Sequence, residues 1–500
     1  MGIPITKDGA VSRAIVEVAD LGYTFTGRDA PSLEDVSFSL EPGTWTLIAG
    51  ATGSGKSTLL RALVGLIPNL ARGAMLGRVT VGGVDTRLQR PAQLAQSIGF
   101  IAQSPDDQLC AATVEAELAF GLENLNLPVE EISHRIASVA ADFGLTEMLS
   151  RPSSQLSGGM KQRLVLAAVT AMQPKVLICD EPLSQLDAVA ARDFLDHLDA
   201  LRRSGLTIVM AEHRLAEVRP YANRELTLDR GRLVDDRPAT SQPPPAPQPP
   251  RFAAPPSSAT PALSLQGLEF RFRGAANPVW SDVSATFRRG ERVAIVGANG
   301  SGKSTLLGVL AGLLRPTAGR FEIAGDLARL PVSLVPQRAD LTLFHRTVRA
   351  ELAYGPRLAG LNPATIAERV DLTARMFRLD AVLDEHPQSL SQGGRVRAAV
   401  AAALAAAPRL LLLDEPTTGQ DLPTMRAIME LLVTCIGTPG GPEALLFSTH
   451  DLETAARYAD RALILADGRL AADVPASRLL DDEALLRSAG LQARQSRRPG

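Results

Sequence analysis

The sequence predicts an α/β fold that occurs twice, in two tandem domains that each hold a mostly parallel sheet flanked by helices. First, a glycine-rich loop lies between an apolar run and a helical pattern in each half of the chain. Second, short continuous apolar runs alternate with helical patterns, which is typical of parallel strands buried on both faces. Third, the two halves align motif by motif, so an internal repeat explains the organisation better than one large domain.

The domain order follows from this repeat. Residues 13–237 form the first expected domain and residues 263–475 the second, after a flexible N-terminus over 1–12. Each copy ends in a hairpin pattern, at Leu226–Arg232 and at Leu463–Arg469. Residues 238–262 are dominated by proline and predict an extended linker with no core of its own. Residues 476–500 are expected to hold a short helix and a disordered charged tail.

Composition excludes several classes of protein. The chain is 45% hydrophobic and 21% charged, with a net charge of −2, so bulk charge gives no case for a nucleic-acid partner. Its three cysteines include no C-x-x-C pair, which argues against a cysteine metal site or a disulfide framework and fits reduced cytosol. The longest alanine-rich run, Ala398–Ala407, is too short to span a bilayer and is expected to be a buried helix. Attachment to a membrane would therefore depend on another protein.

The first glycine-rich loop, Gly50–Thr58, fits the pattern G-x-x-x-x-G-K-[ST] and recurs as Gly297–Thr305. The strand pattern before it and the helix pattern after it are the context that a phosphate-binding loop requires, and two such matches argue against a chance glycine turn. Backbone N–H groups would cradle a phosphate, the lysine would reach the β- and γ-phosphates, and the next serine would ligate Mg²⁺. The predicted nucleotide ligands are Gly50, Thr52, Gly53, Ser54, Gly55, Lys56, Ser57, Thr58, Gly297, Asn299, Gly300, Ser301, Gly302, Lys303, Ser304 and Thr305.

Two acidic pairs end central apolar runs, one in each copy. The runs Val176–Asp180 and Leu410–Asp414 are both followed by Glu-Pro, which places the acids at the carboxyl end of a parallel strand, where ligands bind in open α/β sheets. Asp180 and Asp414 are predicted to help to hold Mg²⁺. Glu181 and Glu415, one residue further, are predicted to orient or deprotonate an attacking water. The sequence therefore predicts a hydrolase that acts on a nucleotide phosphate with Mg²⁺.

A third motif carries a family resemblance. Leu156–Arg163 reads L-S-G-G-M-K-Q-R ahead of the Asp180 strand, and the chain is thus similar to ATP-binding-cassette (ABC) ATPases with two fused nucleotide-binding domains. The resemblance implies an antiparallel β part and a helical signature subdomain in each P-loop domain. It also implies that the signature residues, here Ser157, Gly158, Gly159, Ser391 and Gly393, contact the γ-phosphate held by an opposite domain, within one chain or in a homodimer.

The same resemblance assigns the remaining positions. Phe25 and Phe272 hold the place of the aromatic residue that stacks on adenine, although each could equally be a core strand residue. Gln103 and Gln337 resemble the glutamine that touches the metal or a water. Asp187 and Asp421 match an aspartate that crosses the dimer interface. His213 and His450 end apolar strands and resemble the histidine that contacts the γ-phosphate, where two matching positions favour function over structure.

One stretch resembles a narrower group. Gln103–Leu109 is similar to the Q-x-P-D-x-Q-(apolar) stretch of energy-coupling-factor importers and their cobalt and nickel relatives, and Ala211–Arg214 resembles a fused ATPase for thiamine or hydroxymethylpyrimidine import. The resemblance implies integral membrane coupling and substrate-binding subunits as partners. It places the chain peripherally on the cytoplasmic face of the cell membrane, with grooves beside Gln103 and Gln337 that receive helices of the membrane subunit.

Three alternatives remain at this stage. A soluble tandem ABC ATPase that acts on ribosomes or nucleic acid would carry the same motifs, but typically with a long charged helical linker instead of the proline-rich one here. A regulatory ATP-binding module without turnover is disfavoured because Glu181 and Glu415 are both retained. A fused sugar-importer ATPase is disfavoured because both phosphate loops are complete.

Copy two departs from the signature, since Gln392 stands where copy one has Gly158, and a glutamine side chain at this position is expected to crowd the close approach of the backbone to phosphate. If the halves pair head to tail, the altered signature faces the loop of Lys56, and the intact signature faces the loop of Lys303. We therefore predict two unequal sites, with faster hydrolysis at the Lys303/Glu415 site. Glu415→Gln should lower ATP turnover, measured as phosphate release, more than Glu181→Gln does, and equal losses would contradict this hypothesis.

Overall fold

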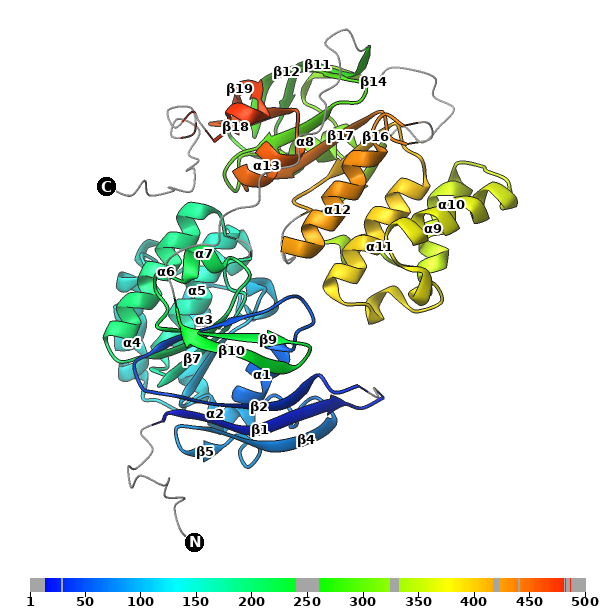
Figure 1. The fold of residues 1–500 in the computed structure, drawn as a ribbon. Helices are drawn as coiled ribbons and strands as arrows, with labels where there is room; N and C mark the ends of the chain where they lie inside the picture. Colours follow the sequence, from blue (N-terminus) through cyan, green and yellow to red (C-terminus); the bar gives the residue numbers. More distant parts are fainter. Residues whose placement is uncertain are drawn as a thin grey trace, which may run out of the picture. The chain divides into compact units, whose positions relative to one another are not determined.

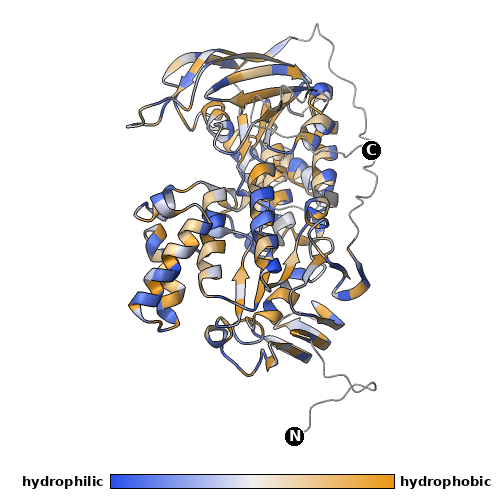
Figure 2. Ribbon diagram, turned by 90° about the vertical axis from the view of Figure 1, so that its left-hand side faces the viewer, coloured by the Kyte–Doolittle hydropathy of each residue, from blue (hydrophilic) through white to orange (hydrophobic). Residues whose placement is uncertain are grey.

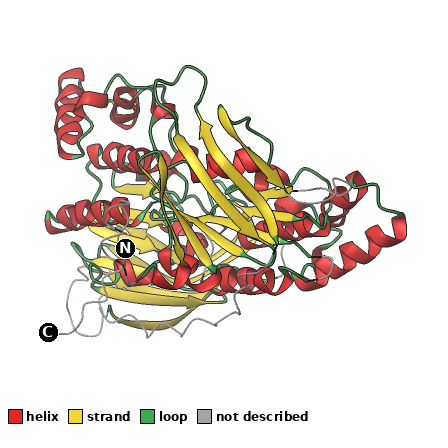
Figure 3. Cartoon of the chain, turned by 90° about the horizontal axis from the view of Figure 1, so that it is seen from above, coloured by secondary structure: helices red, strands yellow, loops and turns green. Residues whose placement is uncertain are grey.

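The computed structural model describes residues 14–27, 30–184, 186–239, 260–323, 332–416, 422–438, 441–480, 482 and 486 (Figure 1). The chain divides into two compact units, Met1–Ala246 (unit 1) and Pro247–Gly500 (unit 2). Each unit contains one copy of the repeat and has its own hydrophobic core. Strands and helices are separated by colour in Figure 3, which shows that both kinds of element build the fold.

The central sheet of unit 1 is parallel except at one edge. Its six strands lie in the order β10 (Arg232–Pro238), β9 (Arg224–Asp229), β3 (Trp45–Ala49), β8 (Thr207–Ala211), β7 (Val176–Asp180) and β6 (Ile98–Ile101). The strands β9, β3, β8, β7 and β6 pair in parallel, and the predicted hairpin makes β10 antiparallel to β9. The parallel core predicted from continuous apolar runs is confirmed.

Both faces of this sheet are covered, which explains why its strands are continuously apolar. Alternate residues of β7 enter different cores: Leu177 and Cys179 pack with the helices on one side, and Val176 and Ile178 pack on the other side. Cys179 is fully buried, as expected for a small apolar side chain. The strand therefore contributes to two hydrophobic layers at once.

A smaller antiparallel sheet and a group of helices complete unit 1. The sheet has the order β2 (Leu33–Leu40), β1 (Val16–Phe25), β4 (Gly73–Val81) and β5 (Val84–Asp85). The helices are α1 (Lys56–Leu63), α2 (Pro91–Leu94), α3 (Val114–Asn124), α4 (Val129–Asp142), α5 (Gly158–Ala171), α6 (Ala188–Arg203) and α7 (Leu215–Val218). Short 3₁₀ turns occur at η1 (Pro105–Asp107), η2 (Thr146–Met148) and η3 (Ser153–Gln155). These parts confirm the two-part architecture that the family resemblance implies.

Unit 2 repeats the arrangement. Its main sheet has the order β15 (Val332–Val335), β16 (Leu410–Leu413), β17 (Ala444–Thr449), β13 (Arg292–Val296), β18 (Arg461–Ala466) and β19 (Arg469–Pro475). A second sheet contains β12 (Trp280–Arg288), β11 (Pro261–Phe270) and β14 (Ala318–Ile323). The helices are α8 (Lys303–Leu310), α9 (Val348–Leu358), α10 (Pro363–Met376), α11 (Gln392–Ala405), α12 (Leu422–Cys435) and α13 (Leu452–Tyr458). The 3₁₀ turns are η4 (Ala339–Thr342), η5 (Asp380–Val382), η6 (Pro387–Ser389) and η7 (Ala476–Arg478).

Figure 2 shows hydrophilic and hydrophobic residues side by side along the helices. The alanine-rich helix α11 buries Ala398, Ala399 and Ala401 in the core of unit 2, as the sequence predicts. Among the helices of the described residues, none combines the length and the apolar character needed to cross a bilayer.

The structure moves both ends of the predicted linker. The strand β10 extends to Pro238, which pairs with Arg224, and β11 begins at Pro261, which pairs with Arg288. Proline is tolerated at such strand ends because it need not donate a hydrogen bond there. Most of the predicted linker, the N-terminal 13 residues, the predicted charged tail and Asp421 lie outside the described residues.

Because each unit has separate cores, we predict that damage to the core of unit 1 stays local. Leu177 is 1% exposed in β7, so Leu177→Ala should lower the free energy of unfolding of unit 1 by about 2–5 kcal/mol. The matched control Leu88→Ala removes a leucine that is 81% exposed and should change it by less than about 0.5 kcal/mol. Hydrogen exchange followed by mass spectrometry would detect lost protection in β3, β7 and β8, and equal loss in β13, β16 and β17 would contradict the prediction.

Candidate functional site

The two glycine-rich loops need glycine at their first position. A Cβ atom at Gly50 would lie 2.4 Å from the Leu228 carbonyl oxygen, and one at Gly297 would lie 2.5 Å from the Leu465 carbonyl oxygen. No real side chain tolerates such a contact with backbone. Each loop therefore turns tightly between the end of its strand and the first residue of α1 or α8.

The loop lysines are the first residues of these helices and are buried. The Lys56 ammonium donates to the carbonyl oxygens of Gly50 at 2.7 Å and of Ala51 at 3.2 Å, and Lys303 does the same to Gly297 at 2.9 Å and Ala298 at 3.2 Å. A buried cation requires such partners. The carbonyl oxygens thus hold each positive charge within its own loop.

The other loop residues have similar but not identical exposure in the two copies. Thr52, Gly53, Asn299 and Gly300 are exposed, Ser54 is buried, and Gly55, Thr58, Ser301, Gly302 and Thr305 are partly buried. The exposed crest of each loop thus presents backbone to the outside. This is the surface that a phosphate would meet.

A serine hydroxyl and a carboxylate lie together beside each lysine. The Ser57 hydroxyl donates to Asp180 Oδ1 at 3.1 Å, and the Ser304 hydroxyl donates to Asp414 Oδ1 at 2.9 Å. Burial raises the pKa of both aspartates, and the hydroxyls oppose that shift. Two oxygen donors on a crowded anionic site fit a hard cation such as Mg²⁺.

In unit 1 the glutamate, the histidine and the glutamine meet. Glu181 Oε1 lies 2.8 Å from His213 Nε2, and Glu181 Oε2 accepts a hydrogen bond from Gln103 Nε2 at 2.9 Å. The same His213 nitrogen lies 3.4 Å from the Lys56 ammonium. Glu181 adopts a left-handed backbone with φ of 49° directly after β7, which turns its side chain into this group.

Unit 2 uses the same residue types with different contacts. Glu415 Oε2 lies 2.9 Å from His450 Nδ1, and Glu415 Oε1 lies 3.5 Å from the Lys303 ammonium. Burial alone would raise the pKa of Glu415, but His450 and Lys303 outweigh it and lower that pKa. Gln337 is exposed, and among the described residues its side chain makes no hydrogen bond to Glu415. The two centres therefore contain the same residue types but differ in their hydrogen bonds and ion pairs.

The signature segments cap helices. The Ser157 hydroxyl accepts from the Met160 N–H at 3.4 Å at the start of α5, so Gly158 and Gly159 form the first turn. The Ser391 hydroxyl accepts from the Gly394 N–H at 3.1 Å at the start of α11, next to Gly393. The side chain of Gln392, which was expected to crowd the approach of the backbone to phosphate, lies outside the described residues.

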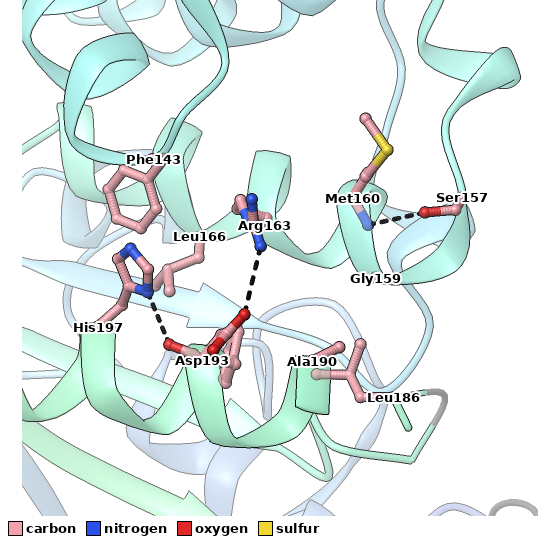
Figure 4. Close-up of a pocket in the computed structure, with 11 residues that line it drawn as sticks. Phe143, Ser157, Gly159, Met160, Arg163, Leu166, Leu186, Ala190, Asp193 and His197 are labelled. Atoms are coloured by element: carbon pink, nitrogen blue, oxygen red, sulfur yellow. Dashed lines mark hydrogen bonds and ion pairs between the residues drawn. The ribbon is translucent and has the colours of Figure 1, made fainter. Parts of the chain in front are cut away.

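Beside the first signature lies a pocket of about 160 Å³ between α5 and α6. Figure 4 shows Ser157 and Met160 on one side, Leu186 and Ala190 on the other, and the ring of His197 against Phe143 at the far end. The two rings stack with centroids 5.1 Å apart. Asp187, the predicted interface aspartate, caps α6 by accepting from the Ala190 N–H at 2.9 Å.

The predicted adenine-stacking residues lie at the ends of corresponding antiparallel strands, Phe25 as the last residue of β1 and Phe272 two residues beyond β11. Phe25 is partly buried and lies edge-on to Tyr23, with ring centroids 4.9 Å apart. Phe272 is 52% exposed and lies edge-on to Phe270 at the same distance. Phe272 therefore has the larger free face.

Sequence reasoning missed two groups that organise these centres. In unit 2 the Ser448 hydroxyl donates to Asp414 Oδ1 at 2.6 Å and accepts from the Glu415 N–H at 2.8 Å. In unit 1 the carboxylate of Glu212 is almost fully buried beside His213. A glutamate at the end of an otherwise apolar strand was a signal for the second group, whereas an ordinary serine gave none for the first.

Each centre combines a buried lysine in a glycine-rich loop with an Asp-Glu pair at the end of a strand two positions away in the sheet. This combination defines an ATP-hydrolysing α/β protein. The family model described as "ABC transporter" matches residues 33–184 and 280–418, which is more than half of the chain. The chain belongs to this family and is an ATP-binding, ATP-hydrolysing protein of the ABC transporter class.

The curated relatives that this chain resembles extend over almost its whole length. A provisionally named ABC transporter ATP-binding protein of Methanosarcina mazei is 33% identical over 95% of this chain and 92% of its own length. One of Streptomyces avermitilis is 35% identical over 93% of this chain and 95% of its own length. A Bacillus subtilis protein, provisionally named HMP/thiamine import ATP-binding protein YkoD, is 33% identical over 94% of this chain and 93% of its own length.

The raised pKa of Asp180 predicts a conflict between stability and activity. A carboxyl group whose pKa is higher in the folded than in the unfolded chain destabilises the fold once pH exceeds the unfolded value. Asp180→Asn should therefore raise the thermal midpoint of the ligand-free protein at pH 7, while Mg²⁺-dependent ATP turnover falls by more than about 10-fold.

The control is Asp236, whose pKa is shifted in the opposite direction from that of Asp180. The hydrogen bond from Arg224 lowers the pKa of Asp236, so Asp236 stabilises the fold above its unfolded pKa. Asp236→Asn should lower the thermal midpoint at pH 7 and leave turnover unchanged. A lower midpoint for Asp180→Asn would contradict the prediction.

Proposed function

We propose that this protein is the ATP-hydrolysing, energy-coupling subunit of a membrane importer for a micronutrient, such as a vitamin, a vitamin precursor, or a cobalt or nickel ion. The single observation that carries the proposal is the loop Gln103–Leu109 in unit 1, which is held by specific hydrogen bonds and an ion pair. The similarity to the Bacillus subtilis protein named for HMP/thiamine import supports it.

This loop is fixed at both ends. The Gln108 side chain accepts from the Ala102 N–H at 2.7 Å and donates to the Phe100 carbonyl at 3.0 Å, so it ties the loop to the end of β6. Asp106 forms an ion pair with Lys161 of α5 at 2.5 Å. The loop thus connects Gln103, which bonds to Glu181, with the helix that begins at the signature. Movement of a partner bound at this loop would therefore be transmitted both to Glu181 and to helix α5.

Within each proposed site the residues have separate roles. Lys56 and Lys303 would stabilise charge on the phosphates of ATP, and Ser57, Asp180, Ser304 and Asp414 would hold Mg²⁺, with Gln103 and Gln337 nearby. Mg²⁺, when bound, supplies charge neutralisation. Glu181 would accept a proton from the attacking water, and the 2.8 Å contact with His213 would hold that carboxylate in place.

Two such sites would form at a head-to-tail interface between domains 13–237 and 263–475, or between two copies of the chain. Ser157 and Ser391 would then offer their helix N-termini to the nucleotide bound by the opposite domain. Such closure makes hydrolysis depend on domain movement, which is the form of energy that a membrane subunit can use.

The partner surface of unit 2 is apolar and aromatic. The rings of Phe344, His345 and Tyr354 pack on one another with centroids 4.5–5.1 Å apart, next to the Gln337 segment in the chain. Leu358, one turn beyond Tyr354 on α9, is 62% exposed. Exposed apolar groups of this kind suit a helix of an integral membrane subunit, so the protein would sit peripherally on the cytoplasmic face of the cell membrane.

Co-purification from membranes tests the proposal. The wild-type chain should retain integral subunits, identified by mass spectrometry, whereas Leu358→Asp should lose them and keep its nucleotide binding. Leu313→Asp is the matched control, because Leu313 is also exposed, at 72%, and follows α8. Recovery with ribosomes or nucleic acid and without integral subunits would contradict the importer proposal.

A further inference from the structure

A buried glutamate in unit 1 is saturated with backbone donors. Glu212 Oε1 accepts from the Leu183 N–H at 2.9 Å, and its Oε2 accepts from the N–H groups of His213 at 2.7 Å and Arg214 at 3.0 Å. Glu212 is only 2% exposed. All three partners are N–H donors, so the site suits a carboxylate and not an amide.

Arg214, two residues after Glu212, contacts the same segment that Glu212 binds through Leu183. Nη1 of Arg214 donates to the carbonyl oxygens of Leu183 at 2.9 Å and Leu186 at 2.7 Å. Its Nε and Nη2 form a bidentate pair with Glu217 at 2.9 and 2.6 Å, which fixes the guanidinium plane. Both backbone polar groups of Leu183 are therefore bound by residues that flank His213.

These contacts join two segments that are distant in the sequence. One follows β7 and contains Leu183 and Leu186, and the other is the end of β8 with His213. The first segment is also tied to the glutamine loop, because the Ser184 hydroxyl donates to the Gln103 carbonyl at 3.2 Å. We call Glu212 and Arg214 together the Glu212–Arg214 clamp.

Unit 2 has no equivalent residues at these positions. Thr449 replaces Glu212, and its hydroxyl accepts from the Asp451 N–H at 3.0 Å. Asp451 replaces Arg214, and its carboxylate caps α13 through the Glu453 N–H at 3.0 Å and the Thr454 hydroxyl at 2.8 Å. Asp451 thus binds its own helix, so the clamp is a property of unit 1.

We propose that Glu212 and Arg214 are positioning residues for ATP hydrolysis in unit 1. They hold His213 and the residues Glu181, Leu183 and Leu186 after β7 as one body, so that the 2.8 Å contact between Glu181 and His213 persists while nucleotide binds and leaves. The proposal rests on the roles proposed for Glu181 and His213 and is independent of the transported compound.

The test compares kcat and KM for ATP in the full-length chain. Glu212→Gln keeps the shape of the side chain but turns an amide donor toward a backbone donor, and Arg214→Ala removes both carbonyl contacts. Each should lower kcat as far as Glu181→Gln does, with the KM for ATP within about 2-fold of wild type. Arg214→Lys keeps the charge and one donor and should recover part of kcat.

The matched control is Arg219→Ala. Arg219 also makes a bidentate pair with a buried glutamate, Glu225, at 2.7 and 2.8 Å, and it touches neither segment joined by the clamp. Its replacement should lower the thermal midpoint and leave kcat within about 2-fold of wild type.

Several results would overturn the proposal. Wild-type kcat in Glu212→Gln and Arg214→Ala would do so, as would a kcat loss no larger than that of Arg219→Ala at the same loss of thermal stability. Failure of Arg214→Lys to fold would assign the clamp to stability alone. If Glu181→Gln leaves turnover intact, the proposed role of Glu181 fails first and the clamp has no reaction to position.

Discussion

The carboxyl edge of a parallel sheet is the constraint on which both centres depend. In unit 1 the adjacent strands β3, β8, β7 and β6 end beside one another, and the residues at or just after their ends provide the glycine-rich loop, His213, the Asp180–Glu181 pair and Gln103. Unit 2 repeats this order with β13, β17, β16 and β15. Side chains far apart in the sequence therefore meet only because these strands are parallel and neighbouring.

Carboxylates are buried at this edge of the sheet, where their charge destabilises the ligand-free fold. Asp180 and Asp414 carry raised pKa values because they are buried; Asp180 accepts a hydrogen bond from the Ser57 hydroxyl, and Asp414 accepts from the hydroxyls of Ser304 and Ser448. A structure that tolerates such groups gives up stability, and binding of a cation and a polyphosphate would relieve the cost. The charged groups of these centres therefore favour binding of a charged ligand at the expense of the stability of the ligand-free fold.

The two centres differ in their hydrogen bonds more than in their motifs. Glu181 is shared between His213 and Gln103, whereas Glu415 is shared between His450 and Lys303. The surrounding groups differ as well, with Glu212 and Arg214 in unit 1 and Ser448 in unit 2. A chain that carries both centres can thus assign them unequal tasks while keeping one fold.

The sequence by itself determined the repeat, the parallel strands, the glycine-rich loops and the acids at the strand ends. These features are local, since a continuous apolar run, a glycine turn and a capped helix each act within about ten residues. Only the tertiary structure decided that Gln103 bonds to Glu181 while Gln337 is exposed, that the two histidines present different ring nitrogens, and that Glu212 binds the N–H of Leu183. Those outcomes depend on distances between side chains on different strands, and no spacing along the chain contains them.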